Sequence, residues 1–394
     1  MFKTLLAATA ASALTAGIAA ADEVKLGVIL GFTGPLESLA PAMAAGAEMA
    51  IKEVSDSGLL LDGDTVTPMR ADSTCIDAGA ATAAAERLIT SDGVAGIMGA
   101  DCSGVTGAIL SNVAVPNGIV MISPSATSPA LSTAEDNGLF FRTAPSDARQ
   151  GVVMTDILME EGIKEVAVTY TNNDYGKGLA DSFQAAFEEA GGTVTISAAH
   201  EDGKADYSAE VGALAAAGGD RLVVAGYVDQ GGSGIVRAAL DSGAFDTFHF
   251  PDGMISAKLV ENFGTEIDGS TGQHPGTDSE GAGVFAELVG DAFDATSPFA
   301  PESYDAAALI LLAMQAAGST DSSVYKDKVM DVANAPGEKI LPGELGKALQ
   351  ILKDGGDIDY VGASAVELIG PGESAGNYRQ IVIEDGEITT VKYR

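Results

Sequence analysis

Short apolar segments alternate with longer amphipathic segments along most of the chain. Residues 24–30 (VKLGVIL) and 94–100 (VAGIMGA) have the composition of buried strands, and residues 78–90 have the composition of a helix. A short helix is expected over 103–113, followed by another strand over 118–124. Strands that alternate with helices predict a parallel sheet built from β-α-β units.

The same pattern restarts after Arg142. An apolar strand there leads into residues 145–147 (PSD), which predict a helix that begins near Ala148. A strand over 165–171 and a helix over 175–190 follow, and the alternation then continues. The restart predicts a second sheet of similar build.

The last third of the chain is less regular. Residues 264–281 (GTEIDGSTGQHPGTDSEG) contain few large apolar side chains and are expected to form a loop. Helices are expected after this loop. The chain then ends in two strands within residues 378–394, joined by a turn at Asp385 and Gly386.

The first 21 residues have the pattern of a secretory signal. One lysine precedes an apolar, alanine-rich run that ends in Ala19-Ala20-Ala21 before Asp22. The run is shorter than the ~20 residues that a membrane span needs. We therefore expect cleavage near Ala21 and an exported, periplasmic protein, in preference to a membrane anchor or a core helix.

Acidic residues dominate the charge. The sequence has 56 aspartates and glutamates against 21 lysines and arginines, a formal net charge of −35. Nucleic acid is therefore not an expected partner, because its phosphates require clustered basic side chains. The acids are spread along the chain, which is typical of a solvated surface.

The cysteines and histidines indicate structural roles. Cys75 and Cys102 lie in a chain that we expect to be exported, where a disulfide is favoured. The histidines at 200, 249 and 274 do not pair at helical spacing, so no metal site is expected.

Two motifs suggest enzymes but lack the context that enzymes require. The glycines near residues 27–34 have the wrong spacing for a dinucleotide fingerprint. Ser374 stands in a G-x-S-x-G sequence, but a proline precedes it, a strand follows it, and no histidine comes later in the chain. A secreted α/β hydrolase that uses Ser374 remains an alternative.

Polar residues follow several predicted strands and are the candidates for a binding site. Because the carboxyl ends of parallel strands share one edge of a sheet, loops that follow neighbouring strands lie close together. A zwitterion could place its carboxylate on the hydroxyls of one lobe and its ammonium on a carboxylate of the other. The candidates from the residues alone are Ser103, Thr106, Ser125, Thr127, Tyr175 and Asp252.

From Val24 onward the sequence resembles the type I periplasmic solute-binding proteins of ABC transporters, in particular the branched-chain amino-acid (Leu/Ile/Val) branch. The resemblance covers nearly the whole chain after the signal. The motifs occur in order: TGPLESLAPAMAAGAEMA, the pair Cys75–Cys102 (which would be the family's disulfide), CSG at 102–104, ISPSATSP at 122–129, FRTAPSD, NDYGKGLA, DYSAE, AGYVDQGG, PDG at 251–253 and ESYDAAAL.

The resemblance implies an α/β fold of two lobes. Each lobe would be a mostly parallel sheet flanked by helices, with three connecting strands as a hinge that closes on ligand. We expect residues 1–21 to be the signal peptide. Residues 22–144 and 273–374 would form lobe 1, and residues 145–272 and 375–394 would form lobe 2.

The resemblance also implies the ligand contacts. Ser103 and Thr127 would hold the ligand carboxylate with backbone groups of Ala126, and Tyr175 and Asp252 would face its α-ammonium. Asp252 stands where the branched-chain proteins commonly carry glutamate, so the charge is kept on a shorter side chain.

Other positions bear on specificity. An aromatic residue that is often found in the first loop of the family is replaced near Leu39. Tyr227, Asp229 and Gln230 are further candidates for the cleft wall and would favour a more polar ligand.

These observations predict a monomeric binding protein, without a cofactor, that delivers an amino acid to the membrane permease of an ABC importer. The ligand would be a branched-chain or similar aliphatic amino acid. The alternatives are the same fold with an amide, a urea-like compound or an aromatic acid as ligand, the hydrolase above, and the sensor domain of a receptor.

Overall fold

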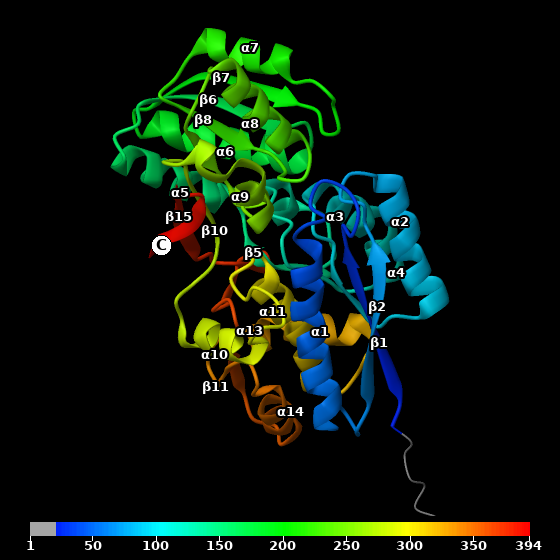
Figure 1. Ribbon diagram of the computed structural model, residues 1–394. Coiled ribbons are helices and arrows are strands. Elements are labelled where there is room, and N and C mark those ends of the chain that lie inside the picture. The colour runs from blue at the N-terminus through cyan, green and yellow to red at the C-terminus, as the bar shows by residue number, and fades with distance from the viewer. Residues whose placement is uncertain (1–20) are drawn as a thin grey trace, which may run out of the picture.

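A computed structural model describes residues 21–394 as two lobes, each built around a seven-stranded sheet (Figure 1). Residues 1–20, and with them nearly all of the expected signal peptide, lie outside the described residues. Neighbouring strands are parallel except in the pairs β13–β14, β10–β15 and β15–β16. The predicted fold class, two lobes with mostly parallel sheets flanked by helices, is confirmed.

The spatial order of the strands differs from their order along the chain in both sheets. From one edge to the other, the first sheet contains β13 (Leu368–Ile369), β14 (Glu373–Ser374), β5 (Phe140–Pro145), β4 (Met121–Ser123), β3 (Gly96–Gly99), β1 (Glu23–Leu30) and β2 (Thr65–Asp72). The second contains β16 (Glu387–Tyr393), β15 (Tyr378–Glu384), β10 (Thr271–Pro275), β9 (Phe248–Phe250), β8 (Arg221–Ala225), β6 (Glu165–Thr171) and β7 (Thr193–His200). A small separate sheet pairs β11 (Glu338–Ile340) with β12 (Ile358–Tyr360).

Helices accompany both sheets. Those with the first sheet are α1 (Ala40–Ser57), α2 (Ala78–Arg87), α3 (Ser103–Ile109), α4 (Val115–Asn117), α10 (Glu280–Val289), α11 (Ala300–Ala317), α12 (Ser322–Tyr325), α13 (Val329–Ala333) and α14 (Leu345–Lys353). Those with the second are α5 (Asp147–Glu160), α6 (Asp174–Glu189), α7 (Ser208–Ala217), α8 (Gly231–Ser242) and α9 (Ala257–Phe263). Short 3-10 or π turns are η1 (Leu88–Asp92), η2 (Leu110–Ala114), η3 (Pro129–Thr133), η4 (Asp252–Met254), η5 (Gly264–Ile267) and η6 (Lys326–Lys328).

The chain passes between the sheets three times. The passages lie between β5 and α5, between β10 and α10, and between β14 and β15. β10 belongs to the second sheet as far as Pro275, whereas we expected lobe 1 to resume at residue 273. The exact division into lobes stays a prediction.

The expectation of a loop over residues 264–281 is wrong for Thr271–Pro275, which form β10. This strand lies between β9 and β15, and all five of its residues are buried. The sequence TGQHP carries no apolar run, because buried polar side chains and small residues fill this place. Periodicity therefore gave no signal for the strand.

Apolar packing unites each lobe and continues between them. α1 lies against α11 so closely that a Cβ added to Gly46 would meet the carbonyl oxygen of Ala300 at 2.4 Å. One buried apolar cluster extends from the first sheet to α5 and α6 of the second lobe. A second cluster lies within the second lobe and includes residues of α7, α8 and α9.

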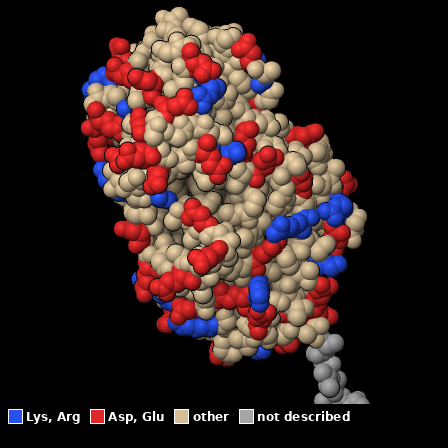
Figure 2. Space-filling view, viewed as in Figure 1, with Lys and Arg blue, Asp and Glu red and all other residues tan. Residues whose placement is uncertain are grey.

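The visible surface carries acidic side chains over both lobes, with fewer basic ones between them (Figure 2). Many basic side chains are in ion pairs with acids, as Arg70 is with Glu48. No helix within residues 21–394 is long and apolar enough to cross a membrane.

Candidate functional site

A small cavity lies between the lobes, beyond the ends of β1, β3, β4, β8 and β9. Its volume of about 10 Å³ is about what one water molecule needs. The residues that line it are Leu36, Asp101, Cys102, Ser103, Ser125, Tyr175, Tyr227, Asp252, Gly253 and Phe299. Both lobes therefore contribute to one polar centre.

Five of the predicted ligand residues meet at this cavity. They are Ser103, Ser125, Tyr175, Tyr227 and Asp252. Leu39, Ala126 and Thr127 do not line it.

Two loops of the first lobe are tied together beside the cavity. The Ser128 amide donates to the Ser103 Oγ at 3.1 Å, and the Ser125 hydroxyl donates to the carbonyl of Asp101 at 3.0 Å. Ser103 accepts a hydrogen bond here, so its own hydroxyl hydrogen is left for another acceptor. The loops after β3 and β4 thus hold the hydroxyls in a fixed arrangement.

In this conformation, the backbone groups of the neighbouring Ala126 and Thr127 make hydrogen bonds that stabilise the loop. The Ala126 amide donates to the Ser123 Oγ at 2.9 Å, and the Thr127 carbonyl accepts from the amide of Asp147 at 2.8 Å. The Thr127 hydroxyl is buried and has no hydrogen-bond partner among residues 21–394. A role in holding a ligand carboxylate stays a prediction for both residues.

Arg142 on β5 holds the loop after β4 in place through hydrogen bonds from its guanidinium. Its guanidinium donates to the carbonyls of Ala126 and Ser128, both at 2.9 Å, and to the Ser132 hydroxyl at 2.6 Å. The same group forms an ion pair with Glu373 at 2.6 Å, and its side chain is only 1% exposed. One buried cation therefore fixes the backbone that carries the polar groups.

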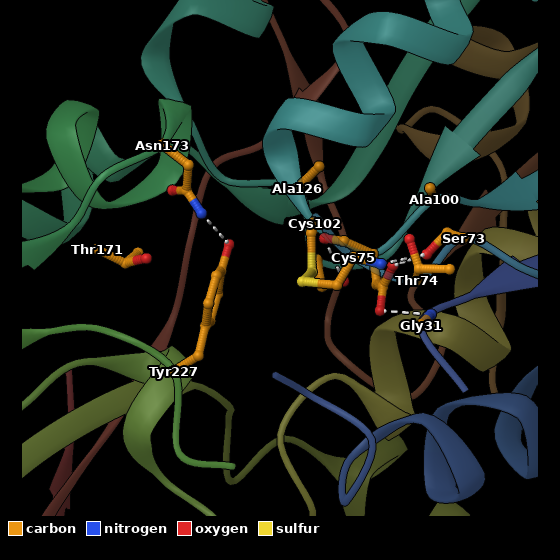
Figure 3. The surroundings of a disulfide bond; sticks show 12 residues. Gly31, Ser73, Thr74, Cys75, Ala100, Cys102, Ala126, Thr171, Asn173 and Tyr227 are labelled. Carbon is orange, nitrogen blue, oxygen red and sulfur yellow. Dashed lines mark hydrogen bonds between the residues drawn. A yellow bond between two sulfur atoms is a disulfide. The ribbon is translucent and has the colours of Figure 1, made fainter. Parts of the chain in front are cut away.

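The disulfide Cys75–Cys102 attaches this region to the loop after β2, as expected (Figure 3). Beside it, a carboxylate oxygen of Asp101 accepts from the Gly31 amide at 2.8 Å, and the other oxygen accepts from the Ser73 hydroxyl at 2.8 Å. Burial raises the pKa of Asp101, and these hydrogen bonds oppose that rise. Asp101 thus joins the loops that follow three strands.

On the second lobe, Asp252 is the centre of a buried hydrogen-bond network. Its carboxylate accepts from the Tyr175 hydroxyl at 2.6 Å and from the Gln150 amide group at 3.0 Å. It also accepts from the backbone amide of Gly253 at 2.7 Å. The side chain is 1% exposed, and burial raises its pKa.

A second carboxyl group, Asp147, lies beside Asp252. The amide nitrogen of Gln150 also donates to Asp147, at 2.8 Å, so it bridges the two carboxyl groups. Burial, and then the charge of Asp252, raise the pKa of Asp147 well above its usual value. Two desolvated carboxyl groups so close to one another favour a cationic group nearby.

Two tyrosines cover this network. The rings of Tyr175 and Tyr227 are stacked, with centroids 5.1 Å apart. Asn173 donates to the Tyr227 hydroxyl at 3.4 Å (Figure 3). A Cβ on Gly253 would come within 2.8 Å of the Tyr175 hydroxyl, so glycine is required for this packing.

Leu39 and Asp229 lie at the contact between the lobes, away from the cavity wall. The Asp229 carboxylate accepts from the Ser38 amide at 2.8 Å, and the Asp229 amide donates to the Pro35 carbonyl at 3.2 Å. Leu39 is buried at the start of α1 and lines a separate crevice between the lobes. Gln230 precedes α8 and does not line the cavity.

The residues that were candidates for catalysis or metal binding do not have the surroundings that those roles require. Ser374 lies in the two-residue strand β14 and is followed by β15, so it has no strand–turn–helix around it. Within residues 21–394 there is no group of three or more metal-ligating side chains. Burial lowers the pKa of His249 and of His274 to about 3, and that of His200 to about 4, so all three are neutral.

Sequence reasoning missed Arg142, Gln150 and Asp101. A signal existed for Arg142, because one arginine inside the apolar segment LFFRTAP has to be paired when buried. Gln150 and Asp101 carried no such signal, since Asp252, Gly31 and Ser73, which they contact, lie far away in the sequence.

The chain is similar to known proteins over most of its length. The profile of a periplasmic binding protein family matches residues 23–335. The Leu/Ile/Val-binding protein homolog 3 of Brucella melitensis is 31% identical over 332 residues, which cover 82% of this chain and 88% of that protein.

Solved structures show the same fold. The leucine-binding protein of Thermotoga maritima superposes with a TM-score of 0.79 at 21% identity, covering 94% of this chain and 98% of that one. A solute-binding protein of R. palustris in complex with 4-hydroxybenzoate has a TM-score of 0.74 at 19% identity, covering 95% and 97%.

Proposed function

The chain belongs to the periplasmic binding protein family, and from this premise we propose that it binds a branched-chain or similar aliphatic amino acid between its lobes and delivers it to the permease of an ABC importer. Family membership confirms the resemblance seen in the sequence and the expectation of a binding protein instead of an enzyme. We further propose that the protein is exported after cleavage near Ala21 and acts as a monomer.

The observation that carries the proposal is the meeting of hydroxyl groups and a buried carboxyl group at one cavity. Ser103 and Ser125 come from the first lobe, and Asp252 comes from the second. A zwitterion would direct its carboxylate to the Ser103 hydroxyl and its ammonium to Asp252. Each hydrogen bond to a charged group contributes roughly 1.5–3 kcal/mol.

The charges around the cavity favour an amino acid over an aromatic acid. Its wall contains two carboxyl groups, Asp101 and Asp252, and no lysine or arginine. A ligand with a carboxylate but no ammonium would leave Asp252 buried without a cation. The aromatic-acid alternative is therefore disfavoured, although a solved structure of the same fold holds 4-hydroxybenzoate.

Ligand entry requires the lobes to separate, because the cavity has room for about one water molecule. Ligand that contacts both lobes would favour a closed arrangement by its differential affinity for the two states. The permease would then recognise the closed, loaded protein.

Isothermal titration calorimetry of the protein without residues 1–21 tests the proposal. Leucine, isoleucine and valine are expected to bind, whereas benzoate is expected not to bind in the cleft. Acetamide and urea in the same series test whether the cleft takes an amide or a urea-like compound instead. Failure of every amino acid to bind would exclude the proposed ligand class.

A further inference from the structure

A second cavity, of about 260 Å³, lies beside the passages between the sheets. It shares no lining residue with the cavity at Asp252. Its wall comes from the loop after β10, from α10, from the first turn of α11 and from the loop after β12, together with β15 and β16. Both lobes therefore contribute to it, as they do to the cleft.

Two buried polar side chains in this wall have an unpartnered atom. Glu302 Oε2 and His274 Nε2 have no hydrogen-bond partner among residues 21–394, and each side chain is 2% exposed. His274 Nδ1 lies 2.7 Å from the Pro275 carbonyl, which can only accept, so Nδ1 carries the hydrogen and Nε2 is an acceptor. Burial raises the pKa of Glu302 to about 8, so this carboxyl group is mainly protonated at neutral pH and is a donor.

Arg379 adds a positive charge to the same wall. Its Nε donates to the Thr390 hydroxyl at 2.8 Å, and its guanidinium makes no ion pair with a carboxylate of the described chain. The remaining wall includes one acid besides Glu302, Asp278, and is otherwise largely apolar, with Phe285, Pro301 and Tyr393. An arginine without an ion pair in a chain of net charge −35 favours an anionic ligand.

We propose that this cavity is a second binding site, for a small carboxylate with an apolar body. Phe285 and Tyr393 would contact the apolar body, Arg379 would pair with the carboxylate, and Glu302 and His274 would bond one further polar group. This proposal does not depend on which ligand the cleft binds.

The position of the site gives a route for entry and keeps it apart from the cleft. A larger crevice between the lobes also contains His274 and Arg379, so it provides a route from solvent. Phe299 lines the cavity at Asp252, and Glu302 lines the second cavity. The start of α11 therefore separates the two sites.

Calorimetric titration with benzoate and with 4-hydroxybenzoate, which adds one further polar group, tests the site. We compare the wild-type protein, Arg379→Met, Ala282→Phe (which fills the second cavity from α10) and Ser103→Tyr (which blocks the cleft). Binding of at least one carboxylate is expected in the wild type and in Ser103→Tyr. It should weaken at least tenfold in Arg379→Met and in Ala282→Phe. Thermal unfolding checks that each variant is folded.

The outcomes separate this proposal from the proposed function. Carboxylate binding that is lost in Ser103→Tyr but kept in both cavity variants would place the ligand in the cleft and overturn the second site. Absence of binding by both probes to the wild type would also overturn it. Leucine titrations of the wild type and of Arg379→Met report on the cleft separately.

Discussion

At the scale of single residues, Asp252 connects the candidate site to the buried hydrogen-bond network of the second lobe. It is joined to Tyr175, Gln150 and Gly253, and through Gln150 to Asp147. Burial raises the pKa of Asp252 and of Asp147, because neither carboxyl group has water around it. A ligand ammonium would compensate the charge of Asp252 directly.

Replacing Asp252 with asparagine keeps the shape and removes the charge. Leucine is expected to bind 10- to 100-fold more weakly, roughly the contribution of a hydrogen bond to a charged group. Calorimetry measures the change, with Asp246→Asn as the control because Asp246 is an exposed aspartate of the same lobe. Binding of 4-methylpentanoate, which is leucine without its ammonium, should not weaken, because this ligand offers no cation to Asp252. An equal loss for both ligands would contradict the role of Asp252.

Arg142 is the second residue with a large expected effect. Arg142→Met leaves Glu373 without its cation and releases two loop carbonyls. Removing one partner of a buried ion pair destabilises the folded protein by about 3–5 kcal/mol. Urea unfolding is expected to show this loss, and Glu373→Gln in the same chain should recover part of it. No recovery in the double variant would mean that the loop carbonyls, and not the ion pair, dominate.

At the scale of elements, the disulfide holds the start of α3 to the loop after β2. The two cysteines are 27 residues apart. The chain-entropy estimate for a loop of this length is about 3.5 kcal/mol. The double variant Cys75→Ser/Cys102→Ser should lose about this much free energy of unfolding in urea. Adding a reductant should destabilise the wild type but not the variant. A variant as stable as the wild type would show that the loop is already ordered without the bond.

The first turn of α11 carries a buried acid that makes stability depend on pH. Burial raises the pKa of Glu302 to about 8, whereas glutamate in an unfolded chain ionises near pH 4.3. Between these values the unfolded chain releases a proton that the folded protein keeps. The contribution of Glu302 to the free energy of unfolding is therefore largest below about pH 4, and it is lost as the pH rises toward 8.

Glu302→Gln removes this dependence. Relative to the variant, the wild type should lose up to about 4 kcal/mol of stability between pH 5 and pH 8. Urea unfolding of both proteins at the two pH values measures the difference. If wild type and variant differ in free energy of unfolding by the same amount at both pH values, Glu302 titrates at the same pH in the folded and unfolded states.

At the scale of the whole molecule, the lobes are in contact around a cavity too small for an amino acid. Asp229 of the second lobe holds the loop before α1 through Ser38 and Pro35. These hydrogen bonds exist only while the lobes are close together, so they stabilise the closed arrangement.

Asp229→Ala removes the Ser38 contact. The protein without ligand is expected to show a larger radius of gyration in small-angle X-ray scattering, because the open state gains population. Leucine should bind about three- to tenfold more weakly, since closure then depends more on the ligand. Asp246→Ala is the matched control. An unchanged radius together with unchanged affinity would show that Asp229 does not contribute to closure.

The two lobes and their parallel sheets could be predicted because the apolar strands alternate with helices. β10 could not be predicted in this way, since buried Gln273 and His274 replace the apolar pattern. Of the candidate site, five residues come together at the cavity: Ser103, Ser125, Tyr175, Tyr227 and Asp252. Ala126 and Thr127 do not line it, and their carbonyls accept hydrogen bonds from Arg142 and from the amide of Asp147.

The sequence by itself determined the alternation of strands and helices, the acidic surface and the family, because periodicity, charge and ordered motifs are local properties. Only the tertiary structure decided that Gln150 bridges two carboxyl groups, that Arg142 holds the loop after β4 and that Asp229 joins the lobes. These arrangements join residues from different elements, and most of their partners lie far apart in the sequence. Burial, which sets their charge states, exists only once the lobes have packed.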